Sequence, residues 1–127
     1  MVWLIMKFSR PSGLSLLRLF SAAFEFGYVK SIYVKQVAHR TNIYAIETDN
    51  DSRLLESLRL RDAKFEVLAK AEKIELVGWT PIEIVKKKYR NKVFDFLETE
   101  FKFIKVGDKT VPLGRFNEME WEEVAEQ

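Results

Sequence analysis

Five residues near the start of the chain could form an anion-binding turn. Pro11, Ser12 and Gly13 interrupt a nearly continuous apolar run, and an apolar-periodic segment begins at Leu14. A strand that turns sharply into a helix leaves backbone N–H groups at the helix start without partners, and the helix dipole favours negative charge there. We therefore consider Arg10, Ser12, Gly13 and Leu14 a candidate carboxylate cradle, which Arg10 assists by a charge-assisted hydrogen bond. The same residues also fit a tight turn that needs glycine only for its backbone.

A second feature with possible chemistry is a run of basic residues without an acid among them. Its members are Lys86, Lys87, Lys88, Arg90 and Lys92. If the run lies on a helix, it could face phosphates or nucleic acid. The alternative is a solvated polar face or a partner for the acidic tail of the chain. No preceding helix pair with a short turn is visible, so a helix-turn-helix is not supported.

Several kinds of site are excluded by what the sequence lacks. Without cysteine there can be no disulfide, thiolate metal site or cysteine nucleophile, and one histidine excludes a multi-histidine metal site. That residue, His39, lies in an expected turn with no acid or serine placed beside it by spacing. There is no P-loop or dinucleotide fingerprint. We therefore expect no catalysis, metal or cofactor.

The composition predicts a folded, soluble and cytoplasmic protein. The 127 residues are 47% hydrophobic and include 10 Phe, which is enough for a real core. A formal net charge of +2 gives no overall attraction to nucleic acid or membranes. The apolar run at residues 3–6 is too short for a signal segment or a membrane span, and the lack of cysteine suits the cytosol.

The first half of the chain predicts alternating strands and helices. An apolar strand over residues 2–9 precedes a helix that begins at Leu14 and stops before Gly27, because its apolar residues recur every three or four positions. Residues 29–37 and 43–48 are rich in strand-forming residues on either side of a polar turn, which predicts a hairpin.

A second helix and a fourth strand complete this pattern. Residues 49–52 form a polar cap, and leucines on one face continue the helix to about Arg61. We favour a strand from about Lys64 that continues toward Val77, although residues 65–69 also fit helical spacing. The order β-α-β-β-α-β over residues 1–77 predicts an α+β, ferredoxin-like fold, with a four-stranded antiparallel sheet and two helices on one face.

Residues 78–127 form a C-terminal extension to this first domain. Thr80, Pro81 and Glu83 are typical of a helix start, and an apolar stripe predicts that the helix runs to about Phe101. A β-hairpin is expected over residues 103–113, followed by an acidic tail.

The first 77 residues resemble an ACT domain, and are most similar to the amino-terminal regulatory domain of acetolactate synthase small subunits. The matching segments are Gly13-Leu14, Leu17-Arg18-Leu19-Phe20, Gly27-Tyr28, Ser31-Ile32, Ile46-Glu47 and Phe65-Glu66-Val67-Leu68. The resemblance implies a homodimer that pairs side by side through the second strand. Effector amino acids would then lie between the first turn of one subunit and the second strand of its partner.

This resemblance implies a ligand site in two halves. Arg10, Ser12, Gly13 and Leu14 would hold the carboxylate, and residues Val29, Lys30, Ser31 and Ile32 of the other subunit would face the side chain. We accordingly expect a non-catalytic regulatory protein that senses an amino-acid-like ligand, with an amino-acid biosynthetic enzyme as its candidate partner. The alternative is a nucleic-acid-associated or transcription-linked protein that uses the basic run and dimerises through its sheet. A third interpretation is a structural dimer with a vestigial site.

Overall fold

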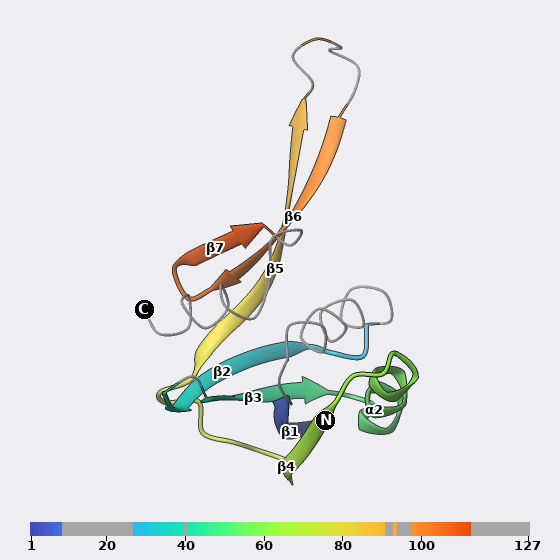
Figure 1. Cartoon of the computed structure of the whole chain (residues 1–127), viewed down its shortest axis with the longest axis vertical. Coiled ribbons are helices and arrows are strands. Elements are labelled where there is room, and N and C mark those ends of the chain that lie inside the picture. The colour runs from blue at the N-terminus through green and yellow to red at the C-terminus, as the bar shows by residue number, and fades with distance from the viewer. Residues whose placement is uncertain (9–26, 40, 91–92, 94–97, 113–127) are drawn as a thin grey trace.

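The computed structural model describes residues 1–8, 27–39, 41–90, 93 and 98–112, which form one antiparallel sheet and one helix. The seven strands lie in the order β4-β1-β3-β2-β5-β6-β7 (Figure 1). The elements are β1 Val2–Phe8, β2 Ser31–Ala38, β3 Thr41–Thr48, α2 Asp51–Leu60, β4 Phe65–Ala71, β5 Thr80–Arg90, β6 Glu98–Val106 and β7 Lys109–Pro112.

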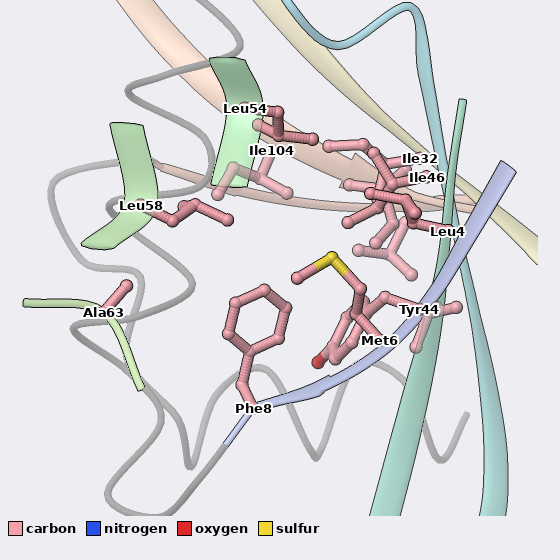
Figure 2. Close-up of a cluster of buried hydrophobic side chains, with 13 residues drawn as sticks. Leu4, Met6, Phe8, Ile32, Tyr44, Ile46, Leu54, Leu58, Ala63 and Ile104 are labelled. Carbon is pink, nitrogen blue, oxygen red and sulfur yellow. The ribbon is translucent and has the colours of Figure 1, made fainter. Parts of the chain in front are cut away.

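One face of the sheet carries the core. Leu4 of β1 is paired with Ile46 of β3, and both side chains are almost completely buried. The helix α2 packs on this face through Leu54 and Leu58 (Figure 2). Ile104 of β6 is also fully buried in the same cluster, so the core includes strands from both halves of the chain.

Two side-chain hydrogen bonds stabilise the start of helix α2. The Asn50 side chain accepts a hydrogen bond from the Arg53 N–H at 3.1 Å, which satisfies one of the free donors of the first turn. Asp51 also accepts a hydrogen bond from Lys70 Nζ of β4 at 2.7 Å. These contacts explain why the helix begins where the polar cap predicts it.

Several predicted elements are confirmed. The opening strand is β1, the hairpin is β2 with β3, and the second helix is α2. The strand interpretation of residues after Lys64 is also correct, although β4 ends at Ala71 and does not reach Val77. The helix predicted from Leu14 lies outside the described residues.

The predicted ferredoxin-like βαββαβ fold is wrong, and so is the ACT-like description of the fold. The sheet has seven strands, and the described residues contain a single helix. The helix expected from Thr80 to Phe101 is instead the strand β5 and the first part of β6. Its supposed apolar stripe is not a buried face, because Tyr89 is 49% exposed and Val93 is 79% exposed.

The alternating side chains of β5 explain why this segment forms a strand. Ile82 is buried and Ile84 is half-buried, and each is paired with a buried residue of β6. β-branched residues fit such a pleated, half-buried surface well. Pro81 is tolerated because it lies at the beginning of the strand.

Beyond the core, β5 and β6 continue as a projecting two-stranded ribbon (Figure 1). We use the name ribbon for residues 85–90 of β5 with residues 98–103 of β6. Its pairing runs from Val85 opposite Phe103 to Arg90 opposite Glu98. The segment 72–79, where the sequence predicts the boundary between two units, connects β4 to β5, and strands on both sides of it belong to one sheet.

Candidate ligand-binding site

A pocket opens where β2 and β5 separate. The two strands are paired only from Ile32 opposite Ile82 to Val34 opposite Thr80. Outside this short ladder, β5 follows β6 and leaves β2. The resulting pocket has a volume of about 340 Å³ and is lined by residues 29–33 and 81–84. This volume lies at the lower end of the range of small-molecule sites.

The pocket brings together one half of the predicted ligand site. Val29, Lys30, Ser31 and Ile32 all line it. Arg10, Ser12, Gly13 and Leu14, which form the other predicted half, lie outside the described residues. The wall opposite residues 29–32 is formed by β5 of the same chain.

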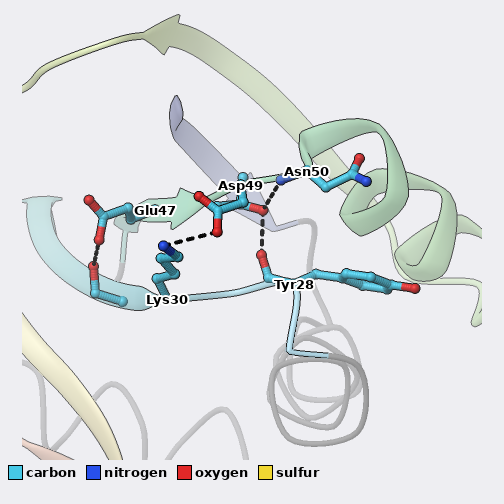
Figure 3. A network of polar contacts seen from close by, with 7 residues as sticks. Tyr28, Lys30, Glu47, Asp49 and Asn50 are labelled. Carbon is cyan, nitrogen blue, oxygen red and sulfur yellow. Dashed lines mark hydrogen bonds and ion pairs between the residues drawn. The ribbon is translucent and has the colours of Figure 1, made fainter. Parts of the chain in front are cut away.

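Hydrogen bonds to β3 hold the β2 wall in place (Figure 3). The Lys30 N–H donates to the carbonyl oxygen of Glu47 at 2.8 Å, and Ser31 Oγ donates to Glu47 Oε1 at 3.1 Å. Lys30 Nζ also forms an ion pair with Asp49 Oδ2 at 2.9 Å. The backbone of this wall is therefore fixed, while the Lys30 ammonium group is held only by an ion pair at the surface.

A buried hydroxyl links this wall to the start of α2. Thr48 Oγ1 donates a hydrogen bond to the carbonyl oxygen of Tyr28 and accepts one from the Asn50 N–H (Figure 3). Thr48 is completely buried, so water cannot replace these bonds. Because Asn50 caps α2, the β2 wall and the helix start are connected through a single side chain.

The pocket has opposite charges on its two walls. Lys30 belongs to the segment that leads into β2, and Glu83 belongs to β5; both residues are exposed. The two walls meet at the strand pair formed by Ile32 of one wall and Ile82 of the other, and both side chains are buried. The Lys30 and Asp49 side chains are 44% and 59% exposed, so their ion pair contributes little stability and a ligand carboxylate can compete with it.

Sequence reasoning missed the β5 wall. Pro81, Glu83 and Ile84 line the pocket but were placed on a predicted helix. The signal that could have identified them is the alternation of Ile82, Glu83 and Ile84, which is typical of a half-buried strand.

The described basic residues are exposed, but they do not form the predicted helical face. Lys86, Lys87, Lys88 and Arg90 lie on β5, and Lys92 is outside the described residues. Strand alternation divides the four residues between the two faces of the ribbon. Lys87 Nζ lies 5.3 Å from the centroid of the Phe103 ring, on the face opposite Lys86 and Lys88.

The predicted dimer contact through the second strand needs a free strand edge. β5 occupies the edge of β2 at residues 32–34. Within the described part of the chain, the outermost strands are β4 and β7.

The described residues hold no cluster of three or more histidine, cysteine, aspartate or glutamate side chains suited to a metal ion. Among them, α2 is too short and too polar to cross a membrane. Comparisons with protein-family models, curated proteins and solved structures found no match to the chain.

Proposed function

We propose that this chain is a non-catalytic regulatory protein that binds a small, zwitterionic, amino-acid-like ligand in the pocket between β2 and β5. The observation that carries the proposal is the placement of Lys30 and Glu83 on opposite walls of the pocket, which meet at the pair Ile32 and Ile82. A carboxylate can pair with Lys30 and an ammonium group with Glu83. An aliphatic side chain can pack against Val29 and Ile84, which are half-buried.

The proposed regulation uses the contacts around Lys30. A ligand carboxylate that pairs with Lys30 competes with Asp49, which directly follows Thr48 and precedes the cap of α2. The ligand would therefore favour a different arrangement at the start of α2, and its differential affinity for the two arrangements sets the size of the response. A partner protein that contacts α2 could read this change.

The class of the proposed ligand indicates the kind of protein that this chain regulates. A protein that senses an amino acid reports on the product of a biosynthetic reaction, so we propose an amino-acid biosynthetic enzyme as its partner. We also propose a cytoplasmic location, which the absence of cysteine suits. Homodimerisation remains part of the proposal, but the described half of the site needs only one chain.

A thermal-shift panel of amino acids and their uncharged analogues tests this function. We expect the melting temperature to rise with an amino acid, and to rise less with the analogue that lacks its charged amino or carboxyl group. A ligand at about 100 times its dissociation constant stabilises the folded state by about 2.7 kcal/mol.

Matched variants show whether the rise in melting temperature comes from binding in the pocket. Glu83→Gln should reduce the response, because it removes the partner of the ammonium group. Glu75→Gln, which changes an exposed residue outside the pocket, should leave the response unchanged. A panel in which no amino acid raises the melting temperature, or an equal loss in both variants, argues against the proposal.

A further inference from the structure

The ribbon has the shape of an element that enters a nucleic-acid groove. Two antiparallel strands project from the body of the sheet, paired along their whole length from Val85 to Arg90 (Figure 1). Paired strands lie about 4.8 Å apart. The major groove of B-form DNA is about 12 Å wide and admits a two-stranded ribbon, whereas the major groove of A-form RNA is too narrow.

Basic side chains occupy one strand of this ribbon. Lys86, Lys88 and Arg90 share one face of β5, because successive side chains of a strand alternate. They continue the face that carries Ile82 and Ile84, so a basic row begins where the hydrophobic core ends. Residues of this row follow one another about every 7 Å and are all exposed.

The charge on the ribbon is asymmetric. The register places Glu100 opposite Lys88, Glu98 opposite Arg90 and Lys102 opposite Lys86, so β6 holds both acidic residues of the ribbon and a single basic one. After Ile82, none of the described strands pairs with β5 on the side that faces β2. The β5 edge therefore offers basic side chains together with backbone N–H groups, and both kinds of group bind phosphates in protein–DNA complexes.

We propose that the β5 edge of the ribbon binds the phosphate backbone of double-stranded DNA without base specificity, through Lys86, Lys88 and Arg90. This surface is separate from the pocket between β2 and β5, and the inference does not depend on the proposed ligand. Lysines on an open strand edge can also serve only to prevent edge-to-edge aggregation, and the experiment distinguishes this role from DNA binding.

Fluorescence anisotropy with a labelled mixed-sequence duplex of about 20 base pairs, between about 50 and 200 mM salt, tests the proposal. The wild-type chain should bind, and its affinity should fall steeply as salt rises. The variant K88Q/R90Q should bind at least about tenfold more weakly, with a salt slope smaller by about 1.8, because two phosphate contacts are lost.

Two control variants keep the result interpretable. K73Q/K109Q removes the same charge from exposed positions away from the ribbon and should bind DNA like the wild type. R90K keeps the charge and should retain most of the affinity. Thermal melting of each variant shows whether its fold is intact.

Three outcomes would overturn the proposal. The first is no wild-type binding to the duplex at about 50 mM salt. The second is an equal loss of affinity in the ribbon and control variants. The third is tighter binding to vesicles of anionic lipid than to duplex DNA, which would assign the ribbon to a membrane surface. In the first case, aggregation of K88Q/R90Q would show that the basic residues only protect the edge.

Discussion

At the scale of single residues, short polar contacts determine how the chain passes from β3 into α2. Thr48, Asp49, Asn50 and Asp51 are consecutive, and each has a different partner: the Tyr28 carbonyl, Lys30, the Arg53 N–H and Lys70. The sequence predicts this segment as a helix cap, because its residue types are those that bond free backbone donors. It does not predict Lys70 or Lys30 as partners, since both contacts depend on how distant strands are aligned.

The contact between Asp51 and Lys70 makes stability depend on pH. The hydrogen bond from Lys70 lowers the pKa of Asp51 below its usual 3.8, although burial acts in the opposite direction. The folded state therefore binds this proton less readily than the unfolded state. The stabilisation is present above pH 3.8 and is lost as the pH falls through the lowered pKa of the folded state.

We expect Lys70→Gln to weaken this dependence. Urea unfolding at a series of pH values from about 6 to 3 should show a smaller loss of unfolding free energy on acidification than in the wild type. Lys73→Gln, at an exposed site two residues after the end of β4, serves as the control. Identical pH profiles for Lys70→Gln and the wild type would contradict this role of Lys70.

At the scale of elements, helix α2 shows how burial decides stability. Leu58 is fully buried against the sheet, whereas Leu60, in the same helix, is 79% exposed. Both are leucines with the same helix propensity, so a comparison of the two sites separates the contribution of packing to stability from that of helix propensity.

Leu58→Ala should lower the unfolding free energy by about 2–5 kcal/mol, because it leaves a cavity in the core. Leu60→Ala should change it by no more than about 0.5 kcal/mol. Chemical denaturation of both variants measures the difference. Similar losses at the two positions would mean that α2 does not pack as described.

The success of sequence reasoning also varies by element. β1, β2, β3 and α2 could be predicted because each has an apolar run or a clear period, with a turn or cap at its boundary. For β4, strand and helix patterns both fit the sequence, and the strand interpretation is correct. β5 could not, because Thr80, Pro81 and Glu83 imitate a helix start and residues 82, 85 and 89 fit helical spacing. The strand is stabilised by pairing with β6 and β2, which are distant in sequence, and tertiary context overrides local preference in such cases. The sequence singles out Val29–Ile32, which line the pocket, but the wall opposite them depends on β5.

At the scale of the whole molecule, the position of β5 changes the expected assembly. It extends the sheet beyond β2 and takes the place that the predicted dimer partner would occupy at residues 32–34. The outermost described strands are poor templates for further pairing: β4 has exposed charges at Glu66 and Lys70 and an irregular register with β1, and β7 is short and ends at Pro112. The described pocket is therefore built within one chain.

The measurement that tests the ligand site most directly is a titration of the isotope-labelled protein with an amino acid that raises its melting temperature, followed by amide NMR. The pocket predicts chemical-shift changes at Lys30, Ser31 and Glu83, with smaller changes at Asn50 through the contacts of Thr48. Changes confined to residues outside the pocket, with Lys30 and Glu83 unaffected, would contradict it.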